Sequence, residues 1–238
     1  MLVICNGAPK GGSTWLVQII IETNLFKRIP DKYQNTKWFN SSIDNSQFEI
    51  FFSEALYKSE NYFIKQHWYN NEKFLNLTFR KDIRMLNIVR DIRDVLVSRY
   101  FHDLRLGRTA AENVESYYWH DKGKKSVNHY IRYHKFWNEL TNQGNVFRCS
   151  YESLKTDFLY TVSRMFEFID INFSASQIND LEEKTSIKNK KFGPGKFFRK
   201  GIVGDWKNHL SMAIIEDLDR LCNDTGYYLL NIQDKCSV

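Results

Sequence analysis

The sequence predicts an α/β protein in which a central parallel sheet is flanked by helices. Four short apolar runs are typical of buried parallel strands: residues 2–6, 62–65, 85–89 and 146–149. Stretches with helical spacing of apolar residues separate these runs, and such alternation predicts right-handed crossovers within one parallel sheet. The length of 238 residues suits a single domain that covers residues 1–238.

The most informative motif follows the first predicted strand. Residues 8–15 read Ala-Pro-Lys-Gly-Gly-Ser-Thr-Trp and lead into a helical pattern at 16–21. A strand, a glycine turn and a helix form a layout that binds phosphate, because backbone N–H groups at the helix N-terminus point at the anion. Lys10 adds a mobile cation, and the following residues supply close backbone approach and hydroxyl donors: Gly11, Gly12, Ser13, Thr14 and Trp15.

The order of residues in this loop separates two interpretations. A Walker A loop places its Lys after the last Gly, whereas Lys10 precedes both glycines. This order argues against an ordinary nucleotide triphosphatase. A strand–turn–helix corner that binds no ligand is the alternative.

Polar residues also follow two other predicted strands. Arg90 stands at the carboxyl end of the strand at 85–89, and Ser98 lies two helical turns further on. A guanidinium with a hydroxyl is a good receptor for a phosphate monoester. Asp94 is expected to cap or brace the start of the helix, and an Arg–Asp ion-pair cluster is the alternative interpretation. Lys65 and His67 follow the strand at 62–65, where a structural His is the alternative to a catalytic one.

Together these motifs resemble, in order, those of sulfotransferases that use 3′-phosphoadenosine 5′-phosphosulfate (PAPS). The loop at 8–15 resembles the family's 5′-phosphosulfate loop, the segment from Arg90 to Ser98 its 3′-phosphate segment, and Lys65-Gln66-His67 its Lys-x-His. Residues 199–207 resemble the family's Arg-Lys-Gly-x-x-Gly-Asp-Trp-Lys almost residue for residue. The family's Leu-Pro after the His is replaced by Trp68-Tyr69, which puts the aim of His67 in doubt.

The resemblance implies a P-loop-NTPase-like sulfotransferase fold. It also implies in-line transfer of a sulfuryl group from PAPS to a hydroxyl or amine of a small-molecule acceptor, leaving 3′-phosphoadenosine 5′-phosphate (PAP). His67 is then the base, Lys10 and Lys65 assist the transfer, and no metal takes part. The residues it assigns to the nucleotide are Lys10, Gly11, Gly12, Ser13, Thr14, Trp15, Arg90, Ser98, Tyr151, Thr185, Ser186, Phe198, Arg199, Lys200 and Gly201.

The remaining features bound the function without deciding it. The net charge of +6 fits an anionic partner, and the four cysteines are too far apart for a zinc site or a disulfide framework. No signal peptide or apolar span is visible, so a cytoplasmic protein without a membrane span is expected. A P-loop small-molecule kinase and a basic nucleic-acid-binding module are the rival functions, although nucleic acid is not the expected partner.

Two questions stay open at this point. Two aromatic-rich stretches, 32–52 and 100–137, are candidates for the acceptor pocket, and their aromatic side chains are equally compatible with the core. Residues 207–216 resemble the family's short dimer motif, but Ser211 and Met212 depart from it, so a homodimer is neither predicted nor excluded.

Overall fold

The computed structural model describes residues 1–33, 50–54, 59–68, 76, 79–140, 145–186 and 201–224. Within these residues a five-stranded sheet has the order β2-β3-β1-β4-β5, and every neighbouring pair is parallel. The strands are β1 (Leu2–Gly7), β2 (Lys27–Arg28), β3 (Tyr62–Gln66), β4 (Ile83–Val89) and β5 (Val146–Ser150).

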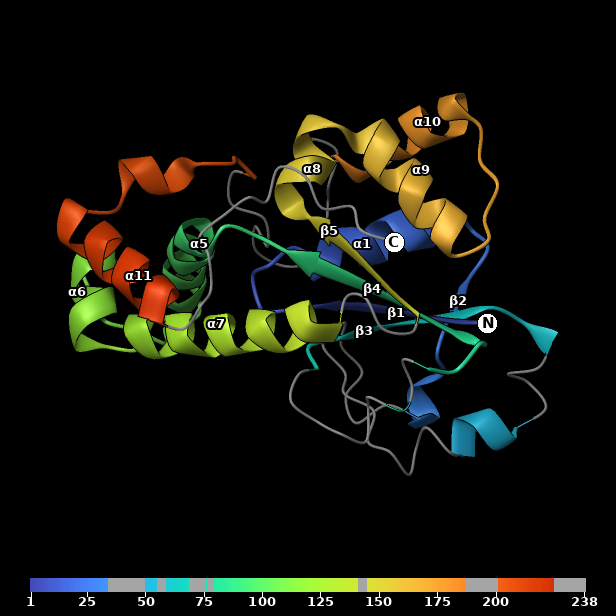
Figure 1. The fold of residues 1–238 in the computed structure, drawn as a ribbon, viewed down its shortest axis with the longest axis horizontal. Helices are drawn as coiled ribbons and strands as arrows, with labels where there is room; N and C mark the ends of the chain where they lie inside the picture. The colour runs from blue at the N-terminus through green and yellow to red at the C-terminus, as the bar shows by residue number, and fades with distance from the viewer. Residues whose placement is uncertain are drawn as a thin grey trace.

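Helices cover both faces of this sheet (Figure 1). One face carries α1 (Ser13–Glu22), α8 (Tyr151–Thr156), α9 (Phe158–Phe168) and α10 (Ala175–Thr185). The other carries α5 (Ile92–Arg105), α6 (Val114–His120), α7 (Gly123–Leu140) and α11 (Met212–Asp224). Short 3-10 turns occur at η1 (Asp31–Tyr33) and η3 (Asp205–Asn208). The predicted α/β class with a parallel sheet flanked by helices is therefore confirmed.

The central strand β1 divides the core into two clusters. Leu2 and Ile4 pack against the α5–α7 side, whereas Val3 and Cys5 pack against the α1–α9 side. This alternation follows from the geometry of a strand, in which successive side chains point to opposite faces. Because both faces are covered, all six residues of β1 are buried, which explains its continuous apolar run.

The structure differs from the sequence-based prediction at the ends of elements and in the short ones. The strand predicted at 85–89 begins two residues earlier, at Ile83. The prediction started too late because Arg84 interrupts the apolar pattern; in the structure its side chain pairs with Asp170, just after α9. The helices α6, α8 and α10 and the two-residue strand β2 were not predicted. Cysteines 5, 149 and 222 are buried free thiols, as expected for Cys5 and Cys149, and Cys236 lies outside the described residues.

The strand register brings the predicted motifs to one edge of the sheet. Asn6 of β1 lies beside Gln66 of β3, and Gly7 lies beside Ile88 of β4. The loops that follow β1, β3, β4 and β5 therefore all begin at the carboxyl edge, where ligands of open parallel sheets gather. No helix in the described part of the chain is long and apolar enough to cross a membrane.

Candidate active site

The loop between β1 and α1 is shaped by two left-handed residues. Lys10 has a φ of 72° and Gly12 a φ of 110°. A Cβ atom on Gly12 would lie 2.9 Å from both Ile88 Cδ1 and Tyr151 Cδ2, so only glycine fits there. The N-terminus of α1 has no side-chain cap and no acidic residue in its first turn. Its partial positive charge is therefore left for an anion.

Three cations lie near this helix end: Lys10 in the β1–α1 loop, Lys65 near the end of β3, and Arg90 directly after β4. The Lys65 ammonium donates to the Thr14 hydroxyl at 2.9 Å, which ties the end of β3 to the first turn of α1. Burial, and then the positive charges of Arg105, Lys65, Arg90 and Arg99, together lower the pKa of Lys10 to about 7. Burial also lowers the pKa of Lys65 to about 8. Lys10, Lys65 and Arg90 thus lie within electrostatic reach of one another.

His67 lies at the same edge with a defined tautomer. Its Nδ1 makes a short hydrogen bond with the Gly7 carbonyl oxygen. A carbonyl oxygen only accepts, so Nδ1 carries the hydrogen and Nε2 keeps its lone pair. Burial, and then the charge of Lys65, lowers the pKa of His67 to about 4. The imidazole is therefore neutral at physiological pH and offers Nε2 as a proton acceptor.

The chain after His67 is fixed by a residue to which the sequence analysis gave no role. Asn6 Oδ1 accepts the Trp68 N–H at 2.9 Å, and Asn6 Nδ2 donates to the Trp68 carbonyl at 3.3 Å. Trp137 Nε1 donates to the same carbonyl at 2.6 Å. The two hydrogen bonds between the Asn6 side chain and the Trp68 backbone fix the path of the chain after His67. At this position Trp68 replaces the residue that is usual in the family. Tyr69 lies outside the described residues.

Arg90 is buried between α5, α7 and α8 with one donor unpartnered. Its guanidinium lies 4.2 Å from the centre of the Tyr151 ring, and Nη2 is 3.4 Å from the Ile202 carbonyl oxygen. Nε is buried and has no hydrogen-bond partner among the described residues. The Tyr130 hydroxyl accepts from the Arg90 N–H at 2.9 Å and donates to the Arg90 carbonyl at 2.7 Å, which anchors the backbone here.

Asp94 ties the C-terminal segment to α5 instead of capping the helix. Its Oδ2 accepts the Gly204 N–H at 2.8 Å, and its Oδ1 accepts the Trp206 N–H at 3.0 Å. The cap is Asp91, whose Oδ1 accepts the Arg93 N–H at 2.9 Å. Capping by Asp94 is therefore a correction to make, whereas its bracing of the helix start is confirmed, because Oδ2 also lies 3.8 Å from Arg90 Nη2. The same carboxylate braces a segment more than one hundred residues away in sequence.

The residues around that segment are placed in part. Gly201 and Gly204 have φ values of 63° and 79°, and Gly201 immediately precedes the Ile202 carbonyl that Arg90 contacts. Arg90, Asp94 and the half-buried Ser98 follow one another at four-residue intervals along α5, so they share one face of the helix. Phe198, Arg199 and Lys200 lie outside the described residues.

The predicted adenine side forms a second group at the other flank of the loop. Trp15 Nε1 donates to the Thr185 hydroxyl at 3.2 Å. Its ring meets Tyr151 edge-on, with 5.3 Å between the ring centres, and stacks on Phe158 at 5.9 Å. Ser186 directly follows Thr185 and is the C-cap residue of α10. Trp15, Tyr151 and Thr185 are thus brought together from α1, α8 and α10.

Glu152 is a buried group with no role in the sequence-based prediction. Its Oε1 accepts the Asp91 N–H at 3.1 Å, while Oε2 is buried without a partner among the described residues. Burial raises the pKa of Glu152 to about 7. Its position directly after Tyr151, at the carboxyl end of β5, was the one available signal.

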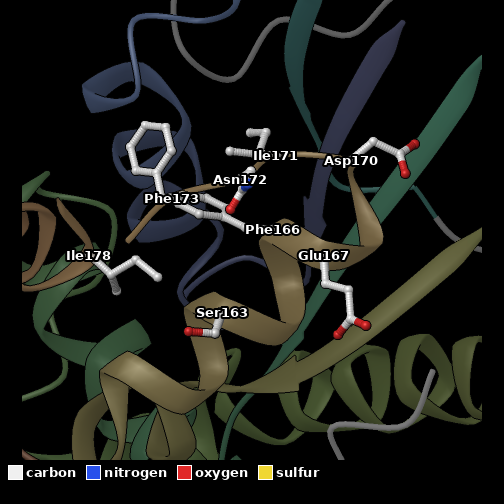
Figure 2. A pocket seen from close by; sticks show the side chains of 8 residues that line it. All are labelled: Ser163, Phe166, Glu167, Asp170, Ile171, Asn172, Phe173 and Ile178. Carbon is white, nitrogen blue, oxygen red and sulfur yellow. The ribbon is translucent and has the colours of Figure 1, made fainter. Parts of the chain in front are cut away.

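A separate hollow of about 490 Å³ lies at the opposite edge of the sheet. Figure 2 shows its side chains coming from α9, from the segment that follows it, and from α10. Asp170, on its rim, pairs with Arg84 near the start of β4, which places the hollow at the amino ends of the strands. The described residues that line it include two carboxylates and no cation, which does not suit a phosphate. Among the described residues, no three His, Cys, Asp or Glu side chains are grouped so that they could hold a metal ion.

Comparisons with known proteins agree with this arrangement. Sulfotransferase 2A1 of Homo sapiens is 23% identical over 242 residues, covering 92% of this chain and 82% of that protein. Sulfotransferase 1E1 of Mus musculus is 26% identical over 245 residues, covering 89% and 78%. The crystal structure of mouse sulfotransferase SULT7A1 complexed with PAP matches with a TM-score of 0.72 and 21% identity, covering 94% of this chain and 82% of that one.

A second solved structure has the same fold. Retinol dehydratase, in complex with androsterone and the inactive cofactor PAP, matches with a TM-score of 0.69 and 17% identity, covering 94% of this chain and 80% of that one. The family model of the sulfotransferase domain matches residues 2–229. A match over nearly the whole length, on a fold with these strand-end motifs, shows that the chain belongs to the sulfotransferase domain family.

Proposed function

We propose that this chain transfers a sulfuryl group from PAPS to a hydroxyl or amine of a small-molecule acceptor, with His67 as the base. The observation that carries the proposal is the meeting of Lys10, Lys65 and Arg90 at one edge of the sheet. Burial, and then repulsion from the neighbouring cations, lowers the pKa of Lys10. Such a group of buried cations is stabilised by an anion that bears several charges.

The residues present fit a nucleotide that carries phosphate at both ends. The Gly12 cradle, which a Cβ would fill, and the uncapped start of α1 suit the 5′ end. The unpartnered Nε of Arg90 suits a second phosphate, with Ser98 on the same helix face. Trp15, Tyr151, Thr185 and Ser186 would line the adenine. Phe198, Arg199, Lys200 and Gly201 would complete the 3′-phosphate side.

The chemistry follows from these placements. When bound, PAPS supplies an electrophilic sulfuryl group whose leaving group is a phosphate. Lys10 stabilises the negative charge that grows toward the leaving group, and Lys65, aligned by the Thr14 hydroxyl, stabilises charge at the sulfuryl side. The backbone of residues 11–15 holds the 5′ end, which converts the transfer into a positioned, in-line step.

His67 then receives the proton of the acceptor on Nε2. The bond from Nδ1 to the Gly7 carbonyl keeps the ring in this orientation. A pKa of about 4 makes the ring a weak base, and Lys65 contributes to that shift. An anionic donor beside Lys65 opposes this charge, so donor binding raises the pKa of His67 toward its ordinary value near 6.5.

The first prediction concerns the base. His67→Asn keeps a side-chain donor for the Gly7 carbonyl but removes Nε2, so kcat should fall by about 10²–10⁴, the usual contribution of a general base. The affinity for PAP should be unchanged. Single-turnover transfer of label from PAPS, with PAP binding by calorimetry on the same samples, gives both values. A variant that retains its turnover would remove His67 from the mechanism.

The second prediction concerns the charge of Lys10 and uses PAP, with AMP as the control nucleotide. In the free protein, Lys10 and Lys65 have pKa values of about 7 and about 8, and a bound phosphate favours their protonated forms. Binding of PAP should therefore take up protons between pH 7 and pH 9, and its affinity should fall as the pH rises. Calorimetry in two buffers of different ionisation enthalpy measures this uptake.

A matched variant assigns the effect. Lys10→Arg keeps a positive charge throughout this pH range, so it should reduce the proton uptake while PAP still binds. Lys10→Ala should cost the transfer step roughly 2.7–4 kcal/mol, by analogy with the loss of an oxyanion donor. PAP that binds without proton uptake in the unaltered protein, or no more tightly than AMP, would contradict the proposed site.

The third prediction concerns Asp94, as a positioning residue for the 3′-phosphate. Asp94→Ala releases the N–H groups of Gly204 and Trp206 and should loosen the C-terminal segment beside Arg90. We expect the affinity for PAP to fall by about 10-fold, in line with 1–3 kcal/mol for an unsatisfied buried donor, while AMP affinity changes little.

Asp157→Ala is the matched control for this test. Asp157 Oδ1 accepts the Tyr160 N–H at 3.1 Å and caps α9, away from Arg90. This variant should lose stability in a thermal melt without changing the ratio of PAP to AMP affinity. Equal ratios in both variants would mean that Asp94 has a structural role only.

A further inference from the structure

A cavity of about 390 Å³ lies between α5 and α7, next to the phosphate loop. Pro9, directly before Lys10, forms part of its wall. Val95 and Leu96 of α5 provide an apolar side, and Arg99, Lys122 and Lys125 provide a cationic one. Its volume falls in the range of about 300–1,000 Å³ that is usual for small-molecule pockets.

The cavity lies on a different face of α5 from the 3′-phosphate residues. Residues 92, 95, 96 and 99 line it, at the spacing of one helical face. Arg90 and Asp94, by contrast, turn toward Ile202, Gly204 and Trp206 of the C-terminal segment. The cavity is therefore not the place of the second phosphate, although both spaces open from the loop that carries Lys10.

The charge of the cavity is strongly one-sided. Among the described residues, its lining contains three cationic side chains and no carboxylate. One of these cations, Arg99, pairs with the fully buried carboxylate of Asp103, which accepts a hydrogen bond from Arg99 Nε at 2.9 Å. Asp103 also accepts a hydrogen bond from the Tyr117 hydroxyl at 2.8 Å. Lys122 donates to the Arg108 carbonyl, a neutral group, at 2.6 Å. Lys125 is exposed and forms no hydrogen bond or ion pair with the described residues.

The positive potential continues from the cavity to the reacting centre. Arg99 and Arg105 both lower the pKa of Lys10, and Lys10 in turn lowers the pKa of His102, which falls to about 4 chiefly through burial. Arg99 also lowers the pKa of His129 in the wall of the cavity. Cations of α5 and of the phosphate loop thus act on titratable groups around this space, and Asp103 offsets part of their effect on His102.

Aromatic walls, which the sequence also allowed in this region, are not what the structure provides. Tyr117 and Tyr118 are fully buried in the core, where their hydroxyls bind Asp103 and Asp217. Phe101 packs against Tyr100 and His209. Of the described lining residues, Tyr130 is the one Tyr, Phe or Trp, and its hydroxyl is bound to the Arg90 backbone.

We infer that this cavity receives the acceptor and that the acceptor is a hydroxylated organic anion. Its apolar body would lie against Val95 and Leu96, and its acidic group would lie toward Lys125 and Arg99. The inference rests on the proposed function for the donor. It goes further in naming the charge of the substrate. Asp103 already pairs with Arg99, but Lys122 and Lys125 form no ion pair with a described carboxylate, and a neutral alcohol or phenol would bring them no counter-ion.

The test compares two probes that differ in one charge. 4-Hydroxyphenylacetate and 4-hydroxyphenylacetamide are titrated into the full chain loaded with PAP. We expect the acid to bind at least about tenfold more tightly than the amide at low salt, and the difference to shrink as salt is added. Equal binding of the two probes, or no binding of either, would overturn the inference.

Two variants of α7 locate the effect. Lys125→Gln should reduce the preference for the acid about three- to tenfold, whereas Lys135→Gln, an exposed lysine of the same helix outside the cavity lining, should leave it unchanged. Acid that binds only without PAP, or that is displaced by PAP, would be occupying the phosphate site and would count against the inference. The same proteins are then assayed for transfer from PAPS to both probes, where the acid should have the higher kcat/KM.

The two proposals fail in different ways. Loss of PAP binding to the unaltered protein would refute the donor site. PAP binding with no preference for the acid would refute the anionic acceptor alone. A Lys125→Gln variant with an unchanged thermal melt and unchanged PAP affinity ensures that the loss of preference is not a loss of folding.

Discussion

Repulsion between cations at the carboxyl edge of the sheet is the constraint on which the rest of the site depends. Lys10 lies in the β1–α1 loop, Lys65 near the end of β3 and Arg90 directly after β4; burial, and then the nearby positive charges, lower the pKa of Lys10 to about 7. Such an arrangement costs folding free energy, because burial and like charges both oppose protonation of the lysines. It persists because the strands, not the side chains, fix where the loops begin.

Two faces of helix α5 border different parts of the site. Arg90, just before the helix, and Asp94 reach the C-terminal segment, whereas Arg99 borders the cavity against α7. Tyr130 links the two, since its ring borders the cavity while its hydroxyl binds both backbone groups of Arg90. A movement of α7 would therefore shift the backbone of Arg90 through these two hydrogen bonds. The proposed donor site and the proposed acceptor cavity thus share a structural element without sharing a ligand.

Long helices and strands and the order of the motifs could be predicted from the sequence. Contacts between side chains that are distant in the sequence could not. The four apolar runs became β1, β3, β4 and β5, because strands buried on both faces have no polar alternation to obscure them. Short helices such as α8 were not predicted, although Ser150 and Ser153 form a capping box at its start. The bonds of Asp94 to Gly204 and Trp206, and the role of Asn6 beside Trp68, depend on tertiary contacts that no local pattern records.

The electrostatics of the site also bear on the order of events at His67. The positive charge of Lys65 and burial keep the free imidazole neutral, with a pKa of about 4. A base that weak removes a proton from an alcohol poorly, so it would act late, after bond formation to sulfur has made the acceptor oxygen more acidic. Donor binding helps further, because the negative charge of the donor opposes that of Lys65. The cations proposed to bind the donor would thus weaken the proposed base in its absence, and the negative charge of the bound donor would restore its strength.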